Sequence, residues 1–150
     1  MVIDLDEEKI RKLAKALDDT IENRDIDKLV SFFAENCEIQ LPGITLNGYE
    51  GLRKAIRWMY NYFGEITFIP VTIMIQSNVF FEEFIMRVKI KGKQEMQVKQ
   101  TEVLIYNSDY KVKSLRLYFD RLELSRAFSS NAVDRLIINK LTKESLKGLQ

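Results

Sequence analysis

The stretch Phe80–Tyr106, FFEEFIMRVKIKGKQEMQVKQTEVLIY, decides the fold of this chain. It contains two extended segments of alternating polarity, joined at Gly92, which is the pattern of a β-hairpin. Because side chains alternate between the two faces of a strand, each segment has one mostly apolar face and one mixed face. The apolar face of the first segment carries Glu82, and that of the second carries Glu102.

The loop between the two segments sets which residues lie opposite each other. The two apolar faces meet only if the loop has an odd number of residues, and Lys91–Lys93 satisfies this with glycine in the middle. In that register Ile90 pairs with Gln94, and Glu82 falls opposite Glu102. Two carboxyls side by side on an apolar face do not both ionise cheaply, because desolvation and mutual repulsion raise the pKa of at least one of them.

We therefore expect Glu82 and Glu102 to share a proton inside a pocket. A carboxyl that keeps its proton near pH 7 donates a hydrogen bond to a substrate oxygen, and its ionised partner accepts a proton. The alternative for Glu102 is a strand acid held by Gln100 or by a tyrosine, without chemistry. For Glu82 the alternative is a β-bulge at Glu83, which would turn the side chain outward.

The chain outside this hairpin is helical in its first third and extended in most of the rest. Helices are predicted after the N-caps Asp6 and Asp25, between a turn at Asn47–Gly48 and a stop at Gly64, and from near Ser130 or Asn131. A short strand over 38–41 ends at Pro42, and longer strands are predicted over 67–76, 80–91, 94–106 and 111–120. Hairpin connections between the long strands make the expected sheet antiparallel and strongly curled, so the fold class is α+β.

The length and the charge balance favour a single globular domain. The chain has 150 residues, which suits one domain over 1–150, with 129–150 as a C-terminal helical extension of it. It has 23 basic and 22 acidic side chains, so the net charge of +1 predicts no binding of nucleic acid. Basic side chains gather at one hairpin, where we expect a solvated strand end: Arg87, Lys89, Lys91 and Lys93.

Rare residue types exclude several kinds of site. The chain has no histidine, which excludes a Ser-His-Asp triad and a histidine metal site. The single cysteine, Cys37, forms no intrachain disulfide and no zinc cluster, so we expect neither a metal nor a cofactor.

The acidic N-terminus does not have the pattern of a signal peptide, and no apolar run approaches the roughly 18 residues needed to cross a bilayer. A free cysteine favours a cytoplasmic location.

Three stretches carry a resemblance to a known superfamily. They are 25–39 (DIDKLVSFFAENCEI), 47–52 (NGYEGL) and 115–120 (LRLYFD), and their order and spacing resemble the nuclear transport factor 2-like superfamily, which includes SnoaL-like and ketosteroid isomerase-like proteins. The resemblance covers roughly residues 6–128. It implies a cone in which a curled sheet wraps a long helix and encloses a mostly apolar pocket.

The resemblance also implies which family chemistries this chain lacks. The base aspartate of a ketosteroid isomerase falls at Leu41, its oxyanion tyrosine at Leu17, and its second oxyanion donor at Glu102. An epoxide hydrolase aspartate falls at Leu117, and the histidines of scytalone dehydratase have no counterpart here. In SnoaL-like proteins an aspartate that ends the last strand is the general acid/base, which implies such a role for Asp120, although strand alternation favours an outward position or a helix N-cap.

These observations together give the expected function. We expect catalytic roles for Glu102, Glu82 and Asp120 in a cofactor-independent isomerase, cyclase or lyase-type reaction on a polyketide-, terpenoid- or steroid-like ligand. The expected ligand-binding residues are Gln100, Phe84, Val98, Leu115, Leu117, Phe119, Leu41, Leu17 and Tyr60. The alternative is a non-catalytic dimeric binding or scaffold module with a vestigial pocket. Apolar residues on the outer sheet face predict a homodimer through the sheet: Phe81, Ile85, Val103 and Ile105.

Overall fold

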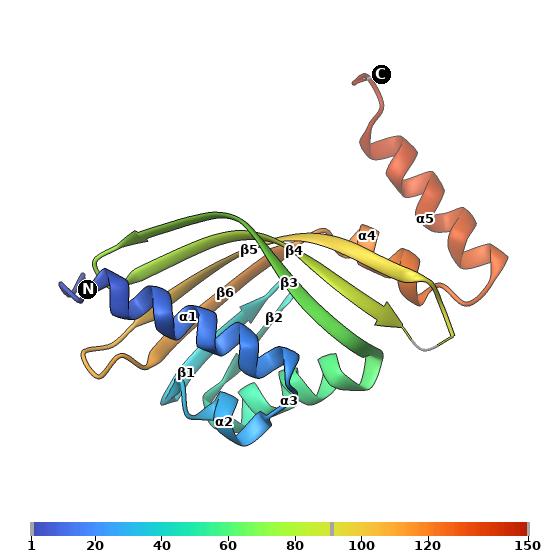
Figure 1. Cartoon of the computed structure of the whole chain (residues 1–150). Coiled ribbons are helices and arrows are strands. Elements are labelled where there is room, and N and C mark those ends of the chain that lie inside the picture. The colour runs from blue at the N-terminus through green and yellow to red at the C-terminus, as the bar shows by residue number, and fades with distance from the viewer. Residues whose placement is uncertain (1, 91, 150) are drawn as a thin grey trace. The chain divides into compact units, whose positions relative to one another are not determined.

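The computed structural model describes residues 2–90 and 92–149, and the chain forms two compact units, Met1–Phe119 and Asp120–Gln150. The first unit contains α1 (Glu7–Glu22), α2 (Ile26–Val30), β1 (Phe33–Leu41), β2 (Ile44–Asn47), α3 (Gly48–Tyr62), β3 (Phe63–Gln76), β4 (Val79–Ile90), β5 (Glu95–Tyr106) and β6 (Val112–Phe119) (Figure 1). The second contains α4 (Arg121–Phe128) and α5 (Ala132–Ser145). Lys91, in the predicted hairpin loop, lies outside the described residues.

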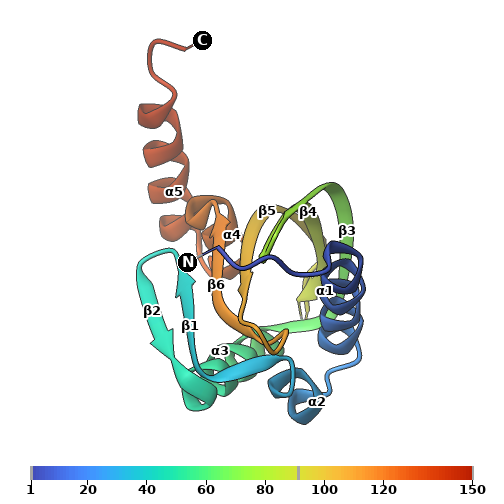
Figure 2. The same ribbon diagram turned by 90° about the vertical axis from the view of Figure 1, so that its left-hand side faces the viewer.

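The first unit is built on one six-stranded sheet in the order β2-β1-β6-β5-β4-β3. Figure 2 shows the sheet bending from β2 at one edge to β3 at the other. The predicted α+β class and the curled sheet are confirmed. The predicted antiparallel arrangement is wrong for one pair, because β1 pairs with β6 in parallel while the other neighbours are antiparallel, so the sheet is mixed. Pairing β1 with the last strand brings the first and last thirds of this unit together.

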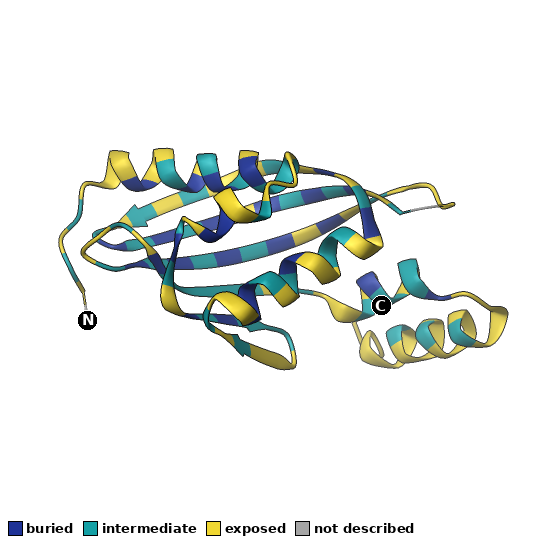
Figure 3. Cartoon of the chain, turned by 90° about the horizontal axis from the view of Figure 1, so that it is seen from below, coloured by how far each residue is buried: buried dark blue, intermediate teal, exposed yellow. Residues whose placement is uncertain are grey.

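Helix α1 covers the concave face of the sheet with its apolar side. Asp6 caps it as predicted, because the Asp6 carboxylate accepts hydrogen bonds from the backbone N–H groups of Glu8 and Lys9. Ile10 and Leu17 are buried on α1 and join a core that also includes residues of β1, β4, β5 and α3. Burying one such side chain stabilises the fold by about 1.5–3 kcal/mol. Figure 3 shows buried positions recurring along the strands and along one side of α1.

Several element boundaries differ from the predictions. Helix α3 ends at Tyr62, and Gly64 lies inside β3 rather than stopping the helix. A Cβ at Gly64 would lie 3.2 Å from the Lys89 backbone oxygen, so close packing against β4 accounts for this glycine. Strand β1 begins at Phe33, five residues before the predicted start, because Phe33 is buried in the core rather than placed on a helix.

The loop between β5 and β6 also differs from the prediction. The predicted strands 94–106 and 111–120 leave a loop of four residues, 107–110, but the loop contains 107–111 and a register shift lies next to Tyr106. The Asn107 side-chain oxygen accepts hydrogen bonds from the backbone N–H groups of Asp109 and Lys111, which stabilises this longer turn. The register shift compensates for the extra residue. Leu115 and Leu117 therefore still share a face with Glu102.

The second unit consists of two helices. Asp120 caps α4 by accepting hydrogen bonds from the backbone N–H groups of Leu122 and Glu123, and Asn131 caps α5, at one of the two predicted starts. Arg126 of α4 donates a hydrogen bond to the Thr142 hydroxyl of α5 at 3.1 Å. No residue of α5 is buried. Within the described part of the chain, no helix is long and apolar enough to cross a membrane.

Candidate functional site

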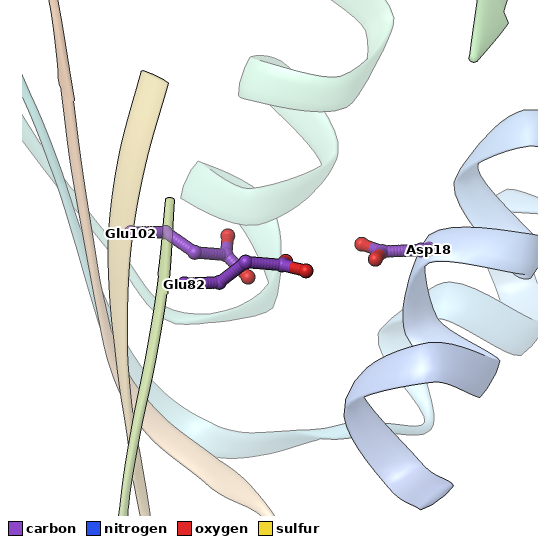
Figure 4. Close-up of side chains that lie close together, drawn as sticks. All are labelled: Asp18, Glu82 and Glu102. Atoms are coloured by element: carbon purple, nitrogen blue, oxygen red, sulfur yellow. The ribbon is translucent and has the colours of Figure 1, made fainter. Parts of the chain in front are cut away.

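Three carboxyl groups from three different elements meet on the concave side of the sheet (Figure 4). Asp18 comes from α1, Glu82 from β4 and Glu102 from β5. One carboxylate oxygen of each lies within 4.8 Å of those of the other two. We call these three residues the acid cluster. Side chains so far apart in sequence meet here only because the sheet curls around α1.

The two strand acids lie where the hairpin analysis placed them. Glu82 pairs directly with Glu102 across the antiparallel strands, so the predicted register is confirmed. Both side chains face inward between apolar neighbours, and Glu82 is 2% exposed while Glu102 is 8% exposed. No bulge at Glu83 turns Glu82 outward, because the two strands stay in step along their whole pairing. Alternation along a regular strand therefore buries both carboxyls.

Asp18 was not among the predicted site residues. It lies one turn beyond Ala14 on α1, at the edge of the apolar stripe that also contains Leu17. The sequence signal for Asp18 is an acidic residue four positions after Ala14, at the edge of the apolar stripe of this helix. The oxyanion tyrosine of a ketosteroid isomerase falls at Leu17, which is 2% exposed and packs in the core. Its neighbour Asp18 is directed toward the strand acids (Figure 4).

Burial and mutual repulsion raise the pKa of each carboxyl in the cluster. Burial raises the pKa of Asp18 to about 8, and the charges of Glu82 and Glu22 contribute to this rise. Burial raises the pKa of Glu82 to about 7. The pKa of Glu102 lies well above its ordinary value, mainly because of burial and then because of the charges of Asp18 and Glu82. The acid cluster therefore retains protons near neutral pH.

Tyr106 carries a buried hydroxyl on which the charges of two residues of the acid cluster act. Its side chain is 1% exposed, and it shares the inner face of β5 with Glu102. Within the described residues, it is the one buried side-chain oxygen that has no hydrogen-bond partner. Burial raises the pKa of this phenol, and the charges of Glu102 and Asp18 raise it further. Tyr106 was also missed from the sequence, because only the folded contacts reveal an unpaired hydroxyl.

The expected ligand-binding residues fall into two groups. Phe84, Val98, Gln100 and Leu17 are buried, and the Gln100 amide donates a hydrogen bond to the Met86 sulfur at 3.6 Å. The remaining expected ligand-binding residues on the sheet are partly exposed: Leu41, Leu115, Leu117 and Phe119.

A groove of about 290 Å³ lies at the ends of β1 and β6. It is lined by Gln40, Leu41, Pro42, Leu117, Tyr118 and Phe119. Leu117 is also the cross-strand partner of Glu102, so the groove reaches the residue next to the acid cluster.

Two of the predicted residues have other partners. The Tyr60 hydroxyl donates a hydrogen bond to the Ile21 backbone oxygen at 2.8 Å, and the Arg24 guanidinium stacks over its ring. The Asp120 carboxylate caps α4 in the second unit.

Cys37 is buried and reduced in the core, where its pKa is raised by burial, as expected for a structural cysteine.

Comparisons with known proteins agree with this geometry. A family model described as a SnoaL-like domain matches residues 14–112. Among curated proteins, none matches the chain.

Several solved structures share the fold. One is the epoxide hydrolase/cyclase-like enzyme SalBIII of pyran ring formation in the polyether salinomycin, which is 15% identical, with a TM-score of 0.70 over 79% of this chain and 95% of that one. An NTF2-like protein of unknown function from Burkholderia pseudomallei K96243 is 14% identical, with a TM-score of 0.74 over 81% of this chain and 98% of that one. A protein from Shewanella putrefaciens CN-32 described as a SnoaL-like polyketide cyclase is 12% identical, with a TM-score of 0.70 over 80% of this chain and 96% of that one.

At these identities the structural likeness establishes the fold, and it places the chain among cone-shaped α+β proteins. The family model covers more than half of the chain, from the middle of α1 to the first residue of β6. This protein belongs to the SnoaL-like domain family.

Proposed function

We propose that this protein binds a small, largely apolar molecule in its cone and transfers protons to and from it with the acid cluster, without a cofactor. The observation that carries the proposal is the convergence of Asp18, Glu82 and Glu102 within 4.8 Å on a buried face. Three buried carboxyls lower the stability of the fold. Each costs desolvation energy, and none is paired with a basic side chain among the described residues.

The arrangement contains both an acid and a base at neutral pH. Glu102 and Asp18 hold their protons, while Glu82, with a pKa of about 7, is partly ionised. A protonated carboxyl donates a hydrogen bond to a carbonyl or ether oxygen of the ligand as charge builds up there. Glu82 then removes a proton from the adjacent carbon or from a hydroxyl. Isomerisation and cyclisation both require this pair of steps.

Two of the similar structures support this class of reaction. SalBIII is named for epoxide hydrolase/cyclase-like activity in pyran ring formation, and the Shewanella protein is described as a polyketide cyclase. Both descriptions name a cyclase, and the first names a pyran ring in a polyether. We infer that the ligand of this chain belongs to the same broad range, which includes polyketides, terpenoids and steroids.

A ligand panel tests the proposal. Steroids, terpenoids and polyketide-like aromatics are added to the protein and to Glu102→Gln, and the melting temperature is measured. A ligand at 100 times its Kd adds roughly 2.7 kcal/mol of stability, which is several degrees for a domain of this size. The matched control is Glu83→Gln, the same change at the adjacent position on the outer face of β4, where Glu83 accepts a hydrogen bond from the Thr72 hydroxyl. Hits that Glu102→Gln weakens and Glu83→Gln keeps support the site, and a ligand bound equally by all three contradicts it.

We also propose that the protein is a homodimer that pairs through the outer face of the sheet and works in the cytoplasm. A row in register across β3–β6 supports the dimer: Met74, Phe81, Val103 and Arg116. Met74 is 57% exposed, and the buried Arg116 Nε has no hydrogen-bond partner. Sedimentation should give a dimer for the protein and a monomer for Val103→Asp. A monomeric protein would contradict the dimer and, with it, the alternative function of a dimeric scaffold.

A further inference from the structure

We propose that α5 lies on the surface of an anionic lipid bilayer, with its exposed aliphatic side chains inserted among the lipids. The inference goes beyond the proposed function and does not depend on it. It is argued from the exposed apolar face of α5, from the side of the helix that packs on α4, and from the positions of its basic side chains.

Helix α5 has an apolar face that α4 does not cover. Four aliphatic side chains on it are each more than half exposed: Val133, Leu136, Ile137 and Leu141. They lie on one face, because residues three and four apart are neighbours on a helix. We call these four residues the α5 stripe. Leu146 and Leu149, which follow the helix, are exposed as well, and Figure 3 shows α5 without a buried position.

The contact with α4 uses a different side of α5. Half-buried positions recur every four residues at Asp134, Ile138 and Thr142, and the Thr142 hydroxyl accepts a hydrogen bond from Arg126 of α4. This row lies about 100° around the helix from the row that begins at Val133, since each residue advances by that angle. A helix of 14 residues is marginal in water unless its apolar face is packed, so the α5 stripe needs a cover.

The basic side chains of this segment favour an anionic surface as that cover. Residues 132–149 carry four basic side chains and two acidic ones. One of the acids, Glu144, is paired with Lys147 at 3.9 Å, whereas Lys140 and Lys143 form no ion pair with the described residues. The cytoplasmic leaflet of a membrane is negatively charged, and each lysine near it strengthens binding. Lysines beside an apolar helix face are typical of helices that lie in the lipid interface.

Lys140 argues against a second copy of α5 as the cover. It follows Leu136 and Ile137 by one turn, so it lies within the α5 stripe. Pairing the stripes of two copies would bury two ammonium groups without acidic partners, which is costly. The stripe also spans only residues 133–141, about 13 Å of helix, whereas three or more heptads indicate a coiled coil. In a bilayer the lysine stem lies along the apolar surface while the ammonium reaches the headgroups.

The second unit follows directly after the strand that lines the groove. Leu117, Tyr118 and Phe119 line the groove at the end of β6, and the next residue, Asp120, begins the unit that contains α5. Apolar molecules of the class proposed above partition from water into bilayers. Attachment through α5 would therefore hold the protein where such molecules are concentrated.

Vesicle binding of the full chain tests the inference. The protein is mixed with phosphatidylcholine vesicles and with vesicles of phosphatidylcholine and phosphatidylglycerol in equal parts, without added ligand, and the bound fraction is measured by sedimentation. We expect the anionic vesicles to bind at least about tenfold more tightly, because Lys140 and Lys143 each add about fivefold. High salt should remove most of this difference.

Variants of exposed residues locate the contact. Leu136→Ser/Ile137→Ser should abolish binding, while Val71→Ser, which removes an exposed aliphatic side chain from β3, should keep it. Lys140→Gln should weaken binding to the anionic vesicles about fivefold. The matched control is Arg135→Gln, which removes one positive charge from the opposite side of the same helix and should weaken binding less.

Several results would overturn the inference. They are a failure of the protein to bind anionic vesicles, equal binding to both kinds of vesicle, and unchanged binding by Leu136→Ser/Ile137→Ser. A fourth is that this double variant, without lipid, loses oligomers or melts several degrees lower, because the α5 stripe is then covered by a second copy or by the first unit of the same chain. The ligand panel is run without vesicles, so it tests the proposed function separately.

Discussion

Glu82 lies directly opposite Glu102 in the antiparallel pair of β4 and β5, with both side chains turned into the concave, apolar side of the sheet. Asp18 approaches the same point from α1. Neighbouring acids of this kind are destabilising unless they keep protons or bind a cation. The physical properties of the molecule should therefore depend on the protonation of this pair.

The stability of the fold should fall as the pH rises from about 4 to 8. A carboxyl whose pKa is raised in the folded state binds more protons folded than unfolded, so stability is intact below its unfolded pKa and is lost as the pH rises through its folded pKa. For Glu82 the window runs from about 4.5 to about 7, and for Asp18 it runs from about 3.8 to about 8. The shift at Glu82 alone corresponds to about 3 kcal/mol. Urea unfolding at pH 5, 7 and 9 measures the loss.

Glu82→Gln should flatten this pH dependence and raise the free energy of unfolding at pH 9. The change keeps the size of the side chain and removes the charge that is costly to bury. Glu83→Gln, at the exposed adjacent position, should follow the unmodified protein at every pH. A Glu82→Gln protein whose stability falls with pH as steeply as that of the control would show that Glu82 is not ionised in the fold.

Tyr106→Phe should raise the free energy of unfolding by about 1 kcal/mol, because it removes a buried hydroxyl that has no protein partner. The same change should weaken any ligand whose binding depends on Glu102, since Tyr106 shares the inner face of β5 with that residue. Unfolding and ligand titration on one preparation check both effects. Destabilisation by more than about 1 kcal/mol would mean that the hydroxyl is hydrogen-bonded in solution.

Gly48→Ala should destabilise the protein by about 1–2 kcal/mol. Gly48 begins α3 with a φ of +66°, and a Cβ there would lie 3.2 Å from the Glu35 backbone oxygen. Gly92→Ala has a similar φ of +75° but nothing within 4 Å of the added Cβ, so it isolates the conformational part of the cost. Thermal unfolding of both variants compares them. Equal losses would mean that the contact with Glu35 adds nothing.

The sequence predicts the inward position of the two strand acids because side chains alternate strictly between the two faces of a strand. Glu82 and Glu102 face inward together whenever the hairpin keeps its register, and a slip of two residues preserves the face. The loop that the predicted strands leave before β6 is one residue too short, because a bulge next to Tyr106 compensates for the extra residue. The alternation of side chains therefore predicts which strand faces meet, whereas a bulge can change the number of residues in the loop between them.

Asp18 and the parallel pairing of β1 depend on tertiary packing, which local patterns do not encode. Asp18 lies at the edge of a helical stripe, and only the rotation of α1 against the sheet decides whether it faces the core or solvent. The β1–β6 pair joins residues about 75 positions apart, such as Ile39 and Leu115. Asp120 shows the converse, because its residue type suits both a catalytic acid and an N-cap, and its hydrogen bonds identify the cap.

The most direct test of the central claim is a carbon-13 NMR titration of the side-chain carboxyls in the folded protein. The account predicts an aspartate that titrates near pH 8, a glutamate near pH 7 and a second glutamate well above its ordinary range. These three signals should change together, since the groups interact. Titration of every aspartate and glutamate between about pH 3 and 5 would contradict the account, because ordinary pKa values mean that the acid cluster is hydrated and holds no protons for catalysis.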